Sequence, residues 1–329
     1  MEFQNLLRAR VCFAAQERYR ILLNGLEYDA VPTGSLRWDG ELPAVGDRVE
    51  VRLTGGRLAV IEAVCQRTTT ISRKQPGSGH GEQVLAANVD LVAIVMALDR
   101  DFNLRRLERY LVLAAECGAA KIIALNKVEL CEDPGVKIAE IGAIAPQIDC
   151  VAMSAIESVE PLRKHIGGGT VVLLGSSGVG KSTIVNGLLG EERQVTRAVR
   201  ESDSRGQHAT THRMMFPLPG GGALIDTPGL RELGLWASQP ALDEAFADVA
   251  NIAAGCRYRD CGHVAEPGCA VAAALASGLI EPGRWASYLK LQGEVRYLER
   301  TTNKTVAAEE KRKWKNIHKA MRHHPKYRR

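Results

Sequence analysis

Short apolar runs separated by turn residues dominate the first 70 residues of the chain. The runs have the length of strands, and Asn-Gly, Asp-Gly and Gly-Gly pairs lie between them. Five such strands predict a small closed barrel, with an OB-fold as the first expectation. The expected strands are residues 7–14, 19–23, 28–31, 48–53 and 58–64.

From residue 88 the pattern changes to longer apolar runs that alternate with helical spacing. Residues 89–98 are nearly all apolar, as in a strand buried on both faces, whereas 104–117 have the period of a helix. The alternation predicts a mainly parallel sheet covered by helices, with a binding site at the carboxyl ends of its strands. Further strands are expected at 121–125, 150–153, 170–174, 214–218 and 223–225, and helices at 136–144, 159–166, from about 181, and at 284–299.

These patterns divide the 329 residues into four parts: an OB-fold barrel at 1–70, a polar linker at 71–87, an α/β core at 88–236 and a mostly helical domain at 237–329. The hydrophobic content of 45% and charged content of 25% are typical of soluble globular proteins. We find no apolar stretch of the roughly 20 residues that a membrane span needs, and no signal peptide. We therefore expect a cytoplasmic protein whose cysteines are thiols or metal ligands. We also expect a monomer with no membrane partner.

Positive charge is concentrated at the C-terminal end. Residues 284–329 carry 14 Lys or Arg against 4 Asp or Glu, a net charge of +10, so the other 283 residues carry −5 of the total of +5. A basic tail with interspersed Trp and His residues suits RNA, although a solvated tail is the plain alternative. Six arginines of the barrel also suit an RNA backbone, but an inert barrel is nearly as compatible with them: Arg8, Arg10, Arg18, Arg20, Arg37 and Arg48.

A glycine-rich segment between an apolar run and a helical run carries the first chemical signal. Residues 175–183 read GSSGVGKST, which fits the phosphate-loop pattern GxxxxGK[ST]. The glycines let backbone N–H groups face a phosphate, Lys181 adds a cation, and the Ser182 hydroxyl can bind Mg²⁺. The expected nucleotide-binding residues here are Gly175, Ser176, Ser177, Gly178, Val179, Gly180, Lys181, Ser182 and Thr183.

Three further motifs follow predicted strands. Asn126, Lys127 and Glu129 resemble the guanine-reading NKxD motif, and Ser154-Ala155 resembles the loop that offers an N–H to the guanine oxygen. In the segment 226–229, Asp226 can reach Mg²⁺ through water and Gly229 can contact a γ-phosphate. The base-reading motifs precede the phosphate loop, whereas ordinary GTPases have the reverse order. This order indicates a circular permutation.

The loop 196–212 is the candidate switch. We expect Thr210, with Thr211 as second choice, to bind Mg²⁺ over the γ-phosphate. Leu230 follows the 226–229 motif where many GTPases have a Gln that orients water. His208 is the natural substitute, and a surface histidine without a role is the alternative.

Three cysteines and one histidine form a second cluster with the spacing C-x4-C-x-H-x5-C. Cys256, Cys261, His263 and Cys269 predict a closed tetrahedral zinc site with a structural role. Unrelated buried thiols are the alternative. The remaining cysteines lie singly, mostly in apolar runs, and are expected to be core thiols: Cys12, Cys65, Cys117, Cys131 and Cys150.

Taken together, the motifs resemble the RsgA (YjeQ/YloQ) family of circularly permuted GTPases. The resemblance rests on GSSGVGKS, the GQHATTH loop, LPGGGALIDTPGL and the cysteine–histidine cluster, and it spans nearly the whole chain. It implies a GTPase that binds the small ribosomal subunit and its rRNA, hydrolyses GTP to GDP with stimulation by the subunit, and acts in late subunit maturation. His208 matches the family's hydrolytic histidine by position.

Two positions depart from the family pattern. Glu129 stands where Asp is usual, which puts strict guanine preference in question, and Ala209 stands where Thr is common. Two other functions remain open from the residues. One is an RNA-binding assembly module with guanine nucleotide as a structural ligand and little turnover. The other is a small-molecule kinase, against which the base-reading motifs argue.

Overall fold

The chain folds into two compact units. The computed structural model describes residues 6–15, 18–74, 82–191, 213–226, 236–264 and 266–302. The first unit comprises Met1–Arg73 and Gln83–Gly234, and the second comprises Lys74–Glu82 and Leu235–Arg329. No helix among these described residues combines the length and apolar character needed to cross a membrane.

The N-terminal barrel confirms the OB-fold prediction. Its strands pair in the order β1-β2-β3-β5-β4, and β4 pairs again with β1 to close the barrel. Only β3 and β5 run parallel. A short helix that the sequence pattern did not reveal, α1 (Gly34–Trp38), follows β3 and buries Leu36. The strands are β1 (Leu7–Ala15), β2 (Arg18–Leu23), β3 (Leu26–Pro32), β4 (Arg48–Gly55) and β5 (Leu58–Val64).

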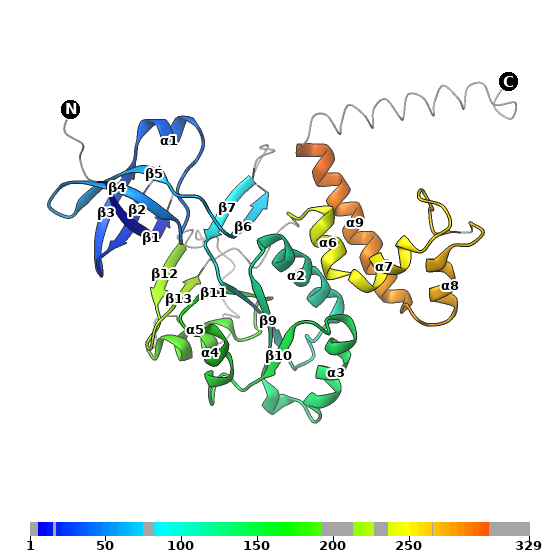
Figure 1. The fold of residues 1–329 in the computed structure, drawn as a ribbon. Helices are drawn as coiled ribbons and strands as arrows, with labels where there is room; N and C mark the ends of the chain where they lie inside the picture. The colour runs from blue at the N-terminus through cyan, green and yellow to red at the C-terminus, as the bar shows by residue number, and fades with distance from the viewer. Residues whose placement is uncertain are drawn as a thin grey trace, which may run out of the picture. The chain divides into compact units, whose positions relative to one another are not determined.

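A parallel sheet forms the α/β core, as the alternating pattern predicted. The strands run in the order β10-β9-β8-β11-β13-β12, and among them only β12 is antiparallel to its neighbour β13. Figure 1 labels these strands except β8. The strand before the phosphate-loop motif, β11, therefore lies at the centre of this sheet. The strands are β8 (Leu91–Ala97), β9 (Ala120–Asn126), β10 (Asp149–Ala152), β11 (Thr170–Leu174), β12 (Arg213–Pro217) and β13 (Ala223–Asp226).

The central strands are buried on both faces because helices cover them. Every residue of β8 and β11 is buried. Alternate residues such as Val95 and Leu173 join one cluster with Leu162 and Leu188, which come from two of the helices. This packing fixes the carboxyl ends of the strands, where the predicted motifs lie. The helices are α2 (Leu104–Cys117), α3 (Pro134–Ile144), α4 (Glu160–Ile166) and α5 (Lys181–Leu189).

The barrel and the α/β core share one sheet of eleven strands. Strand β12 pairs with β13 on one side and with β1 of the barrel on the other, where Phe13 faces Met214 and Ala14 faces Arg213. Gly46 of the barrel packs so closely on the core that a Cβ there would lie 2.1 Å from the carbonyl oxygen of Ala87. The two parts are therefore joined by main-chain pairing rather than by a flexible connection.

Arg10 connects the same two parts through its side chain. Its guanidinium donates to the carbonyl oxygens of Gly46 (3.3 Å) and Asn88 (3.2 Å) and to the Thr170 hydroxyl (2.8 Å). Burial lowers the pKa of Arg10 below its usual value. These contacts give Arg10 a structural role inside the first unit, whereas its expected contact with an RNA backbone stays a prediction.

Two paired strands occupy much of the segment expected to be a linker. Strand β6 (Thr70–Lys74) pairs with β7 (Glu82–Ala87). Hydrogen bonds also join the residues before β6 to those after β7. The Thr68 N–H donates to the Asn88 side chain, and the Thr69 hydroxyl donates to the Val89 carbonyl. The glycine-rich composition concealed these strands, so the interpretation of 71–87 as a plain linker was wrong.

Four helices make up most of the described second unit. They are α6 (Gln239–Ala245), α7 (Ala247–Ala254), α8 (Ala270–Ala276) and α9 (Pro282–Thr302). The fully buried Phe246 packs edge-on against Tyr288 and below the Arg284 guanidinium. Arg284 is 4% exposed and forms two hydrogen bonds with the Asp248 carboxylate, at 2.7 and 2.6 Å. The long α9 contains the helix predicted at 284–299.

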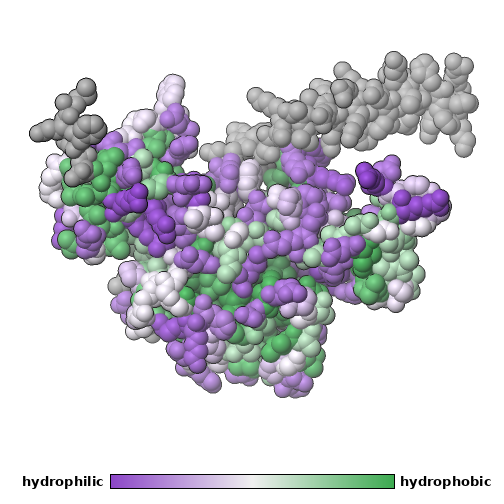
Figure 2. Space-filling view, in the orientation of Figure 1, coloured by the Kyte–Doolittle hydropathy of each residue, from purple (hydrophilic) through white to green (hydrophobic). Residues whose placement is uncertain are grey.

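The surface of the barrel mixes hydrophilic and hydrophobic residues on the face shown in Figure 2. Leu26, Leu53 and Leu58 are among its exposed apolar side chains, and Trp38 is 91% exposed. One of its arginines is paired within the barrel, because Arg20 donates to Glu27 at 2.6 Å. The barrel therefore does not present a uniformly basic surface.

We predict that Arg10→Met weakens the junction between the barrel and the α/β core. The substitution keeps the apolar stem but removes charged hydrogen bonds to Gly46, Asn88 and Thr170. We expect the free energy of unfolding, measured by urea denaturation, to fall by about 2 kcal/mol. The exposed Arg8, changed to Met, is the control and should stay within about 0.5 kcal/mol of the unchanged protein. Equal stability of the two variants would contradict the role given to Arg10.

Candidate nucleotide and metal sites

Two glycines of the phosphate-loop motif are required by their neighbours. At Gly175, where φ is 153°, a Cβ would lie 2.4 Å from the carbonyl oxygen of Val95. At Gly180, where φ is 95°, a Cβ would lie 2.1 Å from Nδ2 of Asn126. Neither position can hold a side chain, so strands β8 and β9 impose the glycine spacing between β11 and α5.

Lys181 begins α5 and folds back over the loop. Its Nζ donates to the carbonyl oxygen of Gly175 at 2.6 Å and also to that of Ser176. Ser182 and Thr183 follow in the first turn of the helix and are half-buried. The loop thus places an ammonium group beside the N–H groups of a helix N-terminus, an arrangement that favours an anion.

Asn126 joins three of the predicted motifs. Its Nδ2 donates to the Val179 carbonyl in the phosphate loop, and its Oδ1 accepts from the Ala155 N–H, both at 2.9 Å. Asn126 is 3% exposed, at the end of β9. The side chain therefore aligns the phosphate loop with the Ser-Ala segment, a structural role that the sequence alone did not suggest.

The other base-reading candidates lie at the ends of β9 and β10. Lys127 has a left-handed backbone with φ of 65°, and its Nζ lies 2.8 Å from Oδ2 of Asp99. Glu129 is exposed on a short 3₁₀ helix, η1 (Val128–Leu130). Ser154 is 5% exposed, and its hydroxyl has no hydrogen-bond partner among the described residues. A buried hydroxyl of this kind is unusual in a finished core and is consistent with a ligand-binding position.

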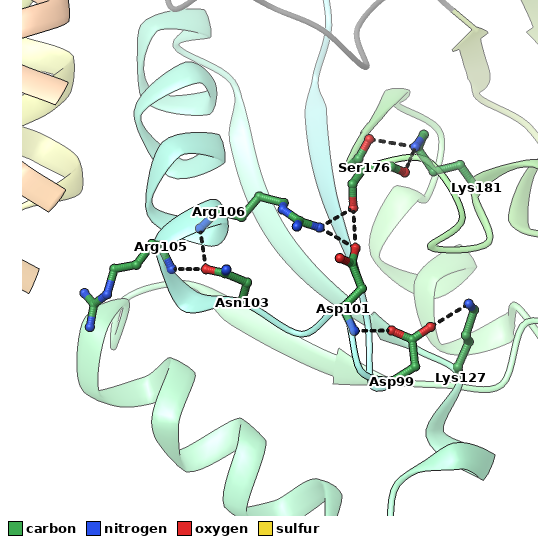
Figure 3. Close-up of polar contacts among 9 residues, drawn as sticks. Asp99, Asp101, Asn103, Arg105, Arg106, Lys127, Ser176 and Lys181 are labelled. Carbon is green, nitrogen blue, oxygen red and sulfur yellow. Dashed lines mark hydrogen bonds and ion pairs between the residues drawn. The ribbon is translucent and has the colours of Figure 1, made fainter. Parts of the chain in front are cut away.

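Three charged residues beside the phosphate loop were missed by sequence reasoning. Asp99 and Asp101 follow β8, and Arg106 lies in the first turn of α2 (Figure 3). Arg106 donates to Asp101 and to the Ser176 hydroxyl. The available signal was position, because acids that directly follow a buried parallel strand lie at its carboxyl end.

A cleft of about 950 Å³ has Asp99 and Asp101 in its lining. Apolar side chains such as Leu98, Leu130 and Val136 line it, together with charged groups from the segments after β8 and η1. Neither Asn126 nor any residue of the phosphate loop is part of its lining. The cleft thus lies beside the candidate nucleotide site rather than within it.

The candidate switch residues are only partly described. Asp226 is the last residue of β13, adjacent to the strand that leads into the phosphate loop. Gly229, His208, Thr210 and Thr211 lie outside the described residues. The basic tail from residue 303 onward also lies outside them.

The cysteine–histidine cluster of the second unit is assembled as predicted. The ligand atoms of Cys256, Cys261, His263 and Cys269 all lie within 4.8 Å of one another and could hold a metal ion. The Nδ1 atom of His263 lies 3.5 Å from the Cys256 sulfur and 3.6 Å from the Cys269 sulfur, and these two sulfurs are 3.9 Å apart. The four residues thus form one compact donor set.

Contacts outside the donor set hold two of its members. The Cys269 sulfur accepts a hydrogen bond from the Ala272 N–H at the start of α8. The His263 ring packs edge-on against Trp285 of α9, with ring centroids 5.5 Å apart. The cluster therefore links the start of α8 with α9, and such outer contacts typically orient metal ligands.

Three of the cysteines outside the cluster have thiols that burial makes less acidic. Cys12 and Cys117 are buried, and burial raises the pKa of each thiol to about 11. Cys150 is half-buried, and desolvation again raises the pKa of its thiol to about 11. These thiols stay protonated at neutral pH and are poor nucleophiles or metal ligands.

A family model described as RsgA GTPase matches residues 64–236, which include the phosphate loop and the base-reading candidates. The chain is 44% identical to the small ribosomal subunit biogenesis GTPase RsgA of Opitutus terrae, over 97% of this chain and 92% of the relative. It is 47% identical to the protein of the same name from Xanthomonas euvesicatoria, over 78% of this chain and 70% of the relative.

Solved structures show the same fold. YjeQ from Thermotoga maritima is 25% identical, with a TM-score of 0.68 over 88% of this chain and 99% of its own. YloQ, described as a circularly permuted GTPase, is 22% identical, with a TM-score of 0.65 over 90% of this chain and 97% of its own. The permuted order of motifs, the closed barrel and these matches agree, and the chain therefore belongs to the RsgA GTPase family.

Proposed function

We propose that this chain hydrolyses GTP at the phosphate loop and that the small ribosomal subunit stimulates it. The observation that carries the proposal is the position of Asn126, which binds both the phosphate loop and the Ser-Ala segment. A single nucleotide could therefore contact its base and its phosphates on one continuous set of loops. The ribosomal partner is supported by the names of the relatives, which are small ribosomal subunit biogenesis GTPases.

The described residues fit the first steps of GTP binding. Lys181 and the backbone N–H groups of residues 176–182 would hold the β- and γ-phosphates. The Lys181 side chain already lies over the loop, with its Nζ on the Gly175 carbonyl. Ser182 would hold Mg²⁺, together with Thr210 and, through water, Asp226. Magnesium bound there supplies charge neutralisation of the phosphate oxygens. We infer that His208 orients the attacking water once the subunit has ordered the loop.

Base recognition rests on the residues at the ends of β9 and β10. Asn126 uses one Nδ2 hydrogen for Val179, which leaves the second for the base. The Glu129 carboxylate would accept the two N–H donors of the guanine edge, and the Ala155 or Ser154 segment would face the guanine oxygen. The Lys127 stem would pack under the base while its ammonium stays on Asp99.

Zinc is the metal that the second unit fits best. Tetrahedral zinc has bonds of roughly 2.3 Å to sulfur and 2.0–2.1 Å to nitrogen, which place S···S near ~3.8 Å and S···N near ~3.6 Å. The observed 3.9 Å between Cys256 and Cys269, and 3.5 and 3.6 Å to His263, agree with that geometry. With four protein ligands the site has no open position, so we infer a structural role.

A cytoplasmic, monomeric state remains the prediction of the sequence.

We predict that His208→Ala abolishes stimulation but preserves GTP binding. A lost water-orienting group should lower the subunit-stimulated rate by roughly 100-fold, because such groups contribute 10²–10⁴-fold to catalysis. Turnover is measured as phosphate release with and without small subunits, and affinity with a fluorescent GTP analogue. The exposed His165 of α4, changed to Ala, is the matched control.

Two outcomes would change the proposal. If His208→Ala keeps the full stimulated rate, the role of His208 is wrong. If the unchanged chain binds GTP and the subunit but shows no turnover with either, the nucleotide is a structural ligand of an assembly module.

We predict that Glu129→Gln shifts base preference from guanine toward xanthine. The glutamine amide cannot accept both guanine donors, but it can donate to the second carbonyl of xanthine. Loss of a charged hydrogen bond should weaken GTP binding about 10- to 100-fold and strengthen XTP binding. Competition among GTP, XTP and ATP measures this, with the exposed Glu132→Gln as control. Unchanged preference in Glu129→Gln would remove Glu129 from the base site.

We predict that Cys269→Ser releases the metal and destabilises the second unit alone. Elemental analysis should find one zinc per unchanged chain and less than one in the variant. Thermal unfolding should lose the transition of the second unit, whereas nucleotide binding by the first unit should persist. Cys65→Ser, at a half-buried cysteine outside the cluster, is the control. Full zinc content in Cys269→Ser would contradict the assignment.

A further inference from the structure

We propose that Arg106 is a positioning residue that keeps the phosphate loop able to bind GTP by cancelling the charge of Asp101. This inference rests on the proposed role of the phosphate loop. It concerns a residue outside the phosphate-loop and base-reading motifs. The three side chains involved, Arg106, Asp101 and Ser176, come from α2, from the segment before α2 and from the phosphate loop (Figure 3).

The three side chains form a closed set of contacts. Arg106 Nη1 donates to Asp101 Oδ2 and, at 3.0 Å, to the Ser176 hydroxyl. The Ser176 hydroxyl in turn donates to Asp101 Oδ2 at 3.2 Å. Each member therefore touches the other two, and the carboxylate of Asp101 lies one hydrogen bond away from the phosphate loop.

The backbone around Arg106 is fixed by a helix cap. Asn103 precedes α2 and accepts hydrogen bonds from the N–H groups of Arg105 (2.9 Å) and Arg106 (3.1 Å). Asp101 is tied to the same segment, because its own N–H donates to Asp99 at 2.9 Å. The guanidinium thus extends from a rigid helix end toward the loop, rather than from a free surface chain.

A carboxylate so close to a phosphate loop is electrostatically unfavourable unless a cation neutralises it. A nucleoside triphosphate brings several negative charges, and an unpaired Asp101 would repel them. The hydrogen bond from Arg106 lowers the pKa of Asp101, so the acid is ionised at neutral pH and its charge must be cancelled by its partner. The neighbouring acid has the same arrangement, since Asp99 is paired with Lys127 at 2.8 Å.

Ser176 is the residue of the phosphate loop that the pair of Arg106 and Asp101 holds in place. Its hydroxyl is held by Arg106 and Asp101, whereas its carbonyl oxygen accepts from Lys181. The residue is therefore fixed from both sides, and its backbone has little freedom to turn away from a phosphate. Loss of the cation would free Ser176 and expose the loop to the Asp101 charge at the same time.

The test compares nucleotide affinities of four full-length variants at low salt. Arg106→Gln keeps hydrogen-bond donors but loses the charge, and Arg106→Lys keeps the charge. Arg106→Gln combined with Asp101→Asn removes both charges. Arg100→Gln makes the same charge change at an exposed arginine of the same segment. Dissociation constants for fluorescent GTP and GDP analogues are measured by titration, and folding is checked by circular dichroism.

We expect Arg106→Gln to weaken GTP binding about tenfold and GDP binding about threefold, because GTP carries more negative charge. The double variant and Arg106→Lys should bind GTP within about threefold of the unchanged chain, and Arg100→Gln should match it. Raising the salt concentration to 0.5 M should shrink the defect of Arg106→Gln, since screening weakens charge repulsion. A purely structural ion pair would weaken GTP and GDP binding to the same extent, because its loss does not depend on the charge of the nucleotide.

Two results would overturn the inference: Arg106→Gln binding GTP as tightly as Arg100→Gln, or the double variant remaining as weak as Arg106→Gln. Lys181→Ala tests the proposed nucleotide site independently of the role given to Arg106. If Lys181→Ala binds GTP as tightly as the unchanged chain, the phosphate loop is not the binding site. If Lys181→Ala loses binding and Arg106→Gln does not, only the role of Arg106 is wrong.

Discussion

The hydrogen bonds of one buried amide side chain hold the candidate nucleotide-binding loops together. Asn126 satisfies the Val179 carbonyl and the Ala155 N–H, and its Nδ2 fills the space in which a Cβ at Gly180 would lie. Without it, two buried backbone groups would lose their partner at a cost of about 1–3 kcal/mol each. Because the contact joins the carboxyl ends of strands that one sheet holds together, it does not depend on the order in which the chain visits them. This explains physically how a permuted chain keeps the geometry of the loops.

Sequence reasoning recovered what is encoded locally. The apolar runs located β5 and α2 at their observed bounds, and the glycine pattern located the turn between β11 and α5. It did not reveal the partners of charged residues, because these are distant in the chain. Arg10 and Thr170 are 160 positions apart, and Arg106 and Ser176 are 70 apart. Only the folded structure shows that such pairs meet. The contacts at the barrel junction, and those among Arg106, Asp101 and Ser176, could therefore not be predicted from the sequence.

The second unit shows another limit of local patterns. Helices α6, α7 and α8 have seven or eight residues each, too few to be stable alone or to give a clear period in the sequence. Tertiary contacts stabilise these helices instead. They are the packing of Phe246 against Tyr288, the Arg284–Asp248 ion pair and the cysteine–histidine cluster. The cluster itself was predictable because three cysteines and one histidine at close spacing identify a metal site directly, whereas helical packing has no such marker.

The pairing of β1 with β12 also bears on how the chain reaches its fold. Residues 7–64 can close the barrel early in synthesis, but Phe13 and Ala14 meet Met214 and Arg213 only after about 150 more residues have been made. Until then this part of β1 offers unpaired backbone groups to any other extended segment. Conversely, a fragment without the barrel would leave β12 as an open sheet edge, the kind of surface from which aggregation begins. The barrel therefore serves as the lateral cap of the sheet of the α/β core.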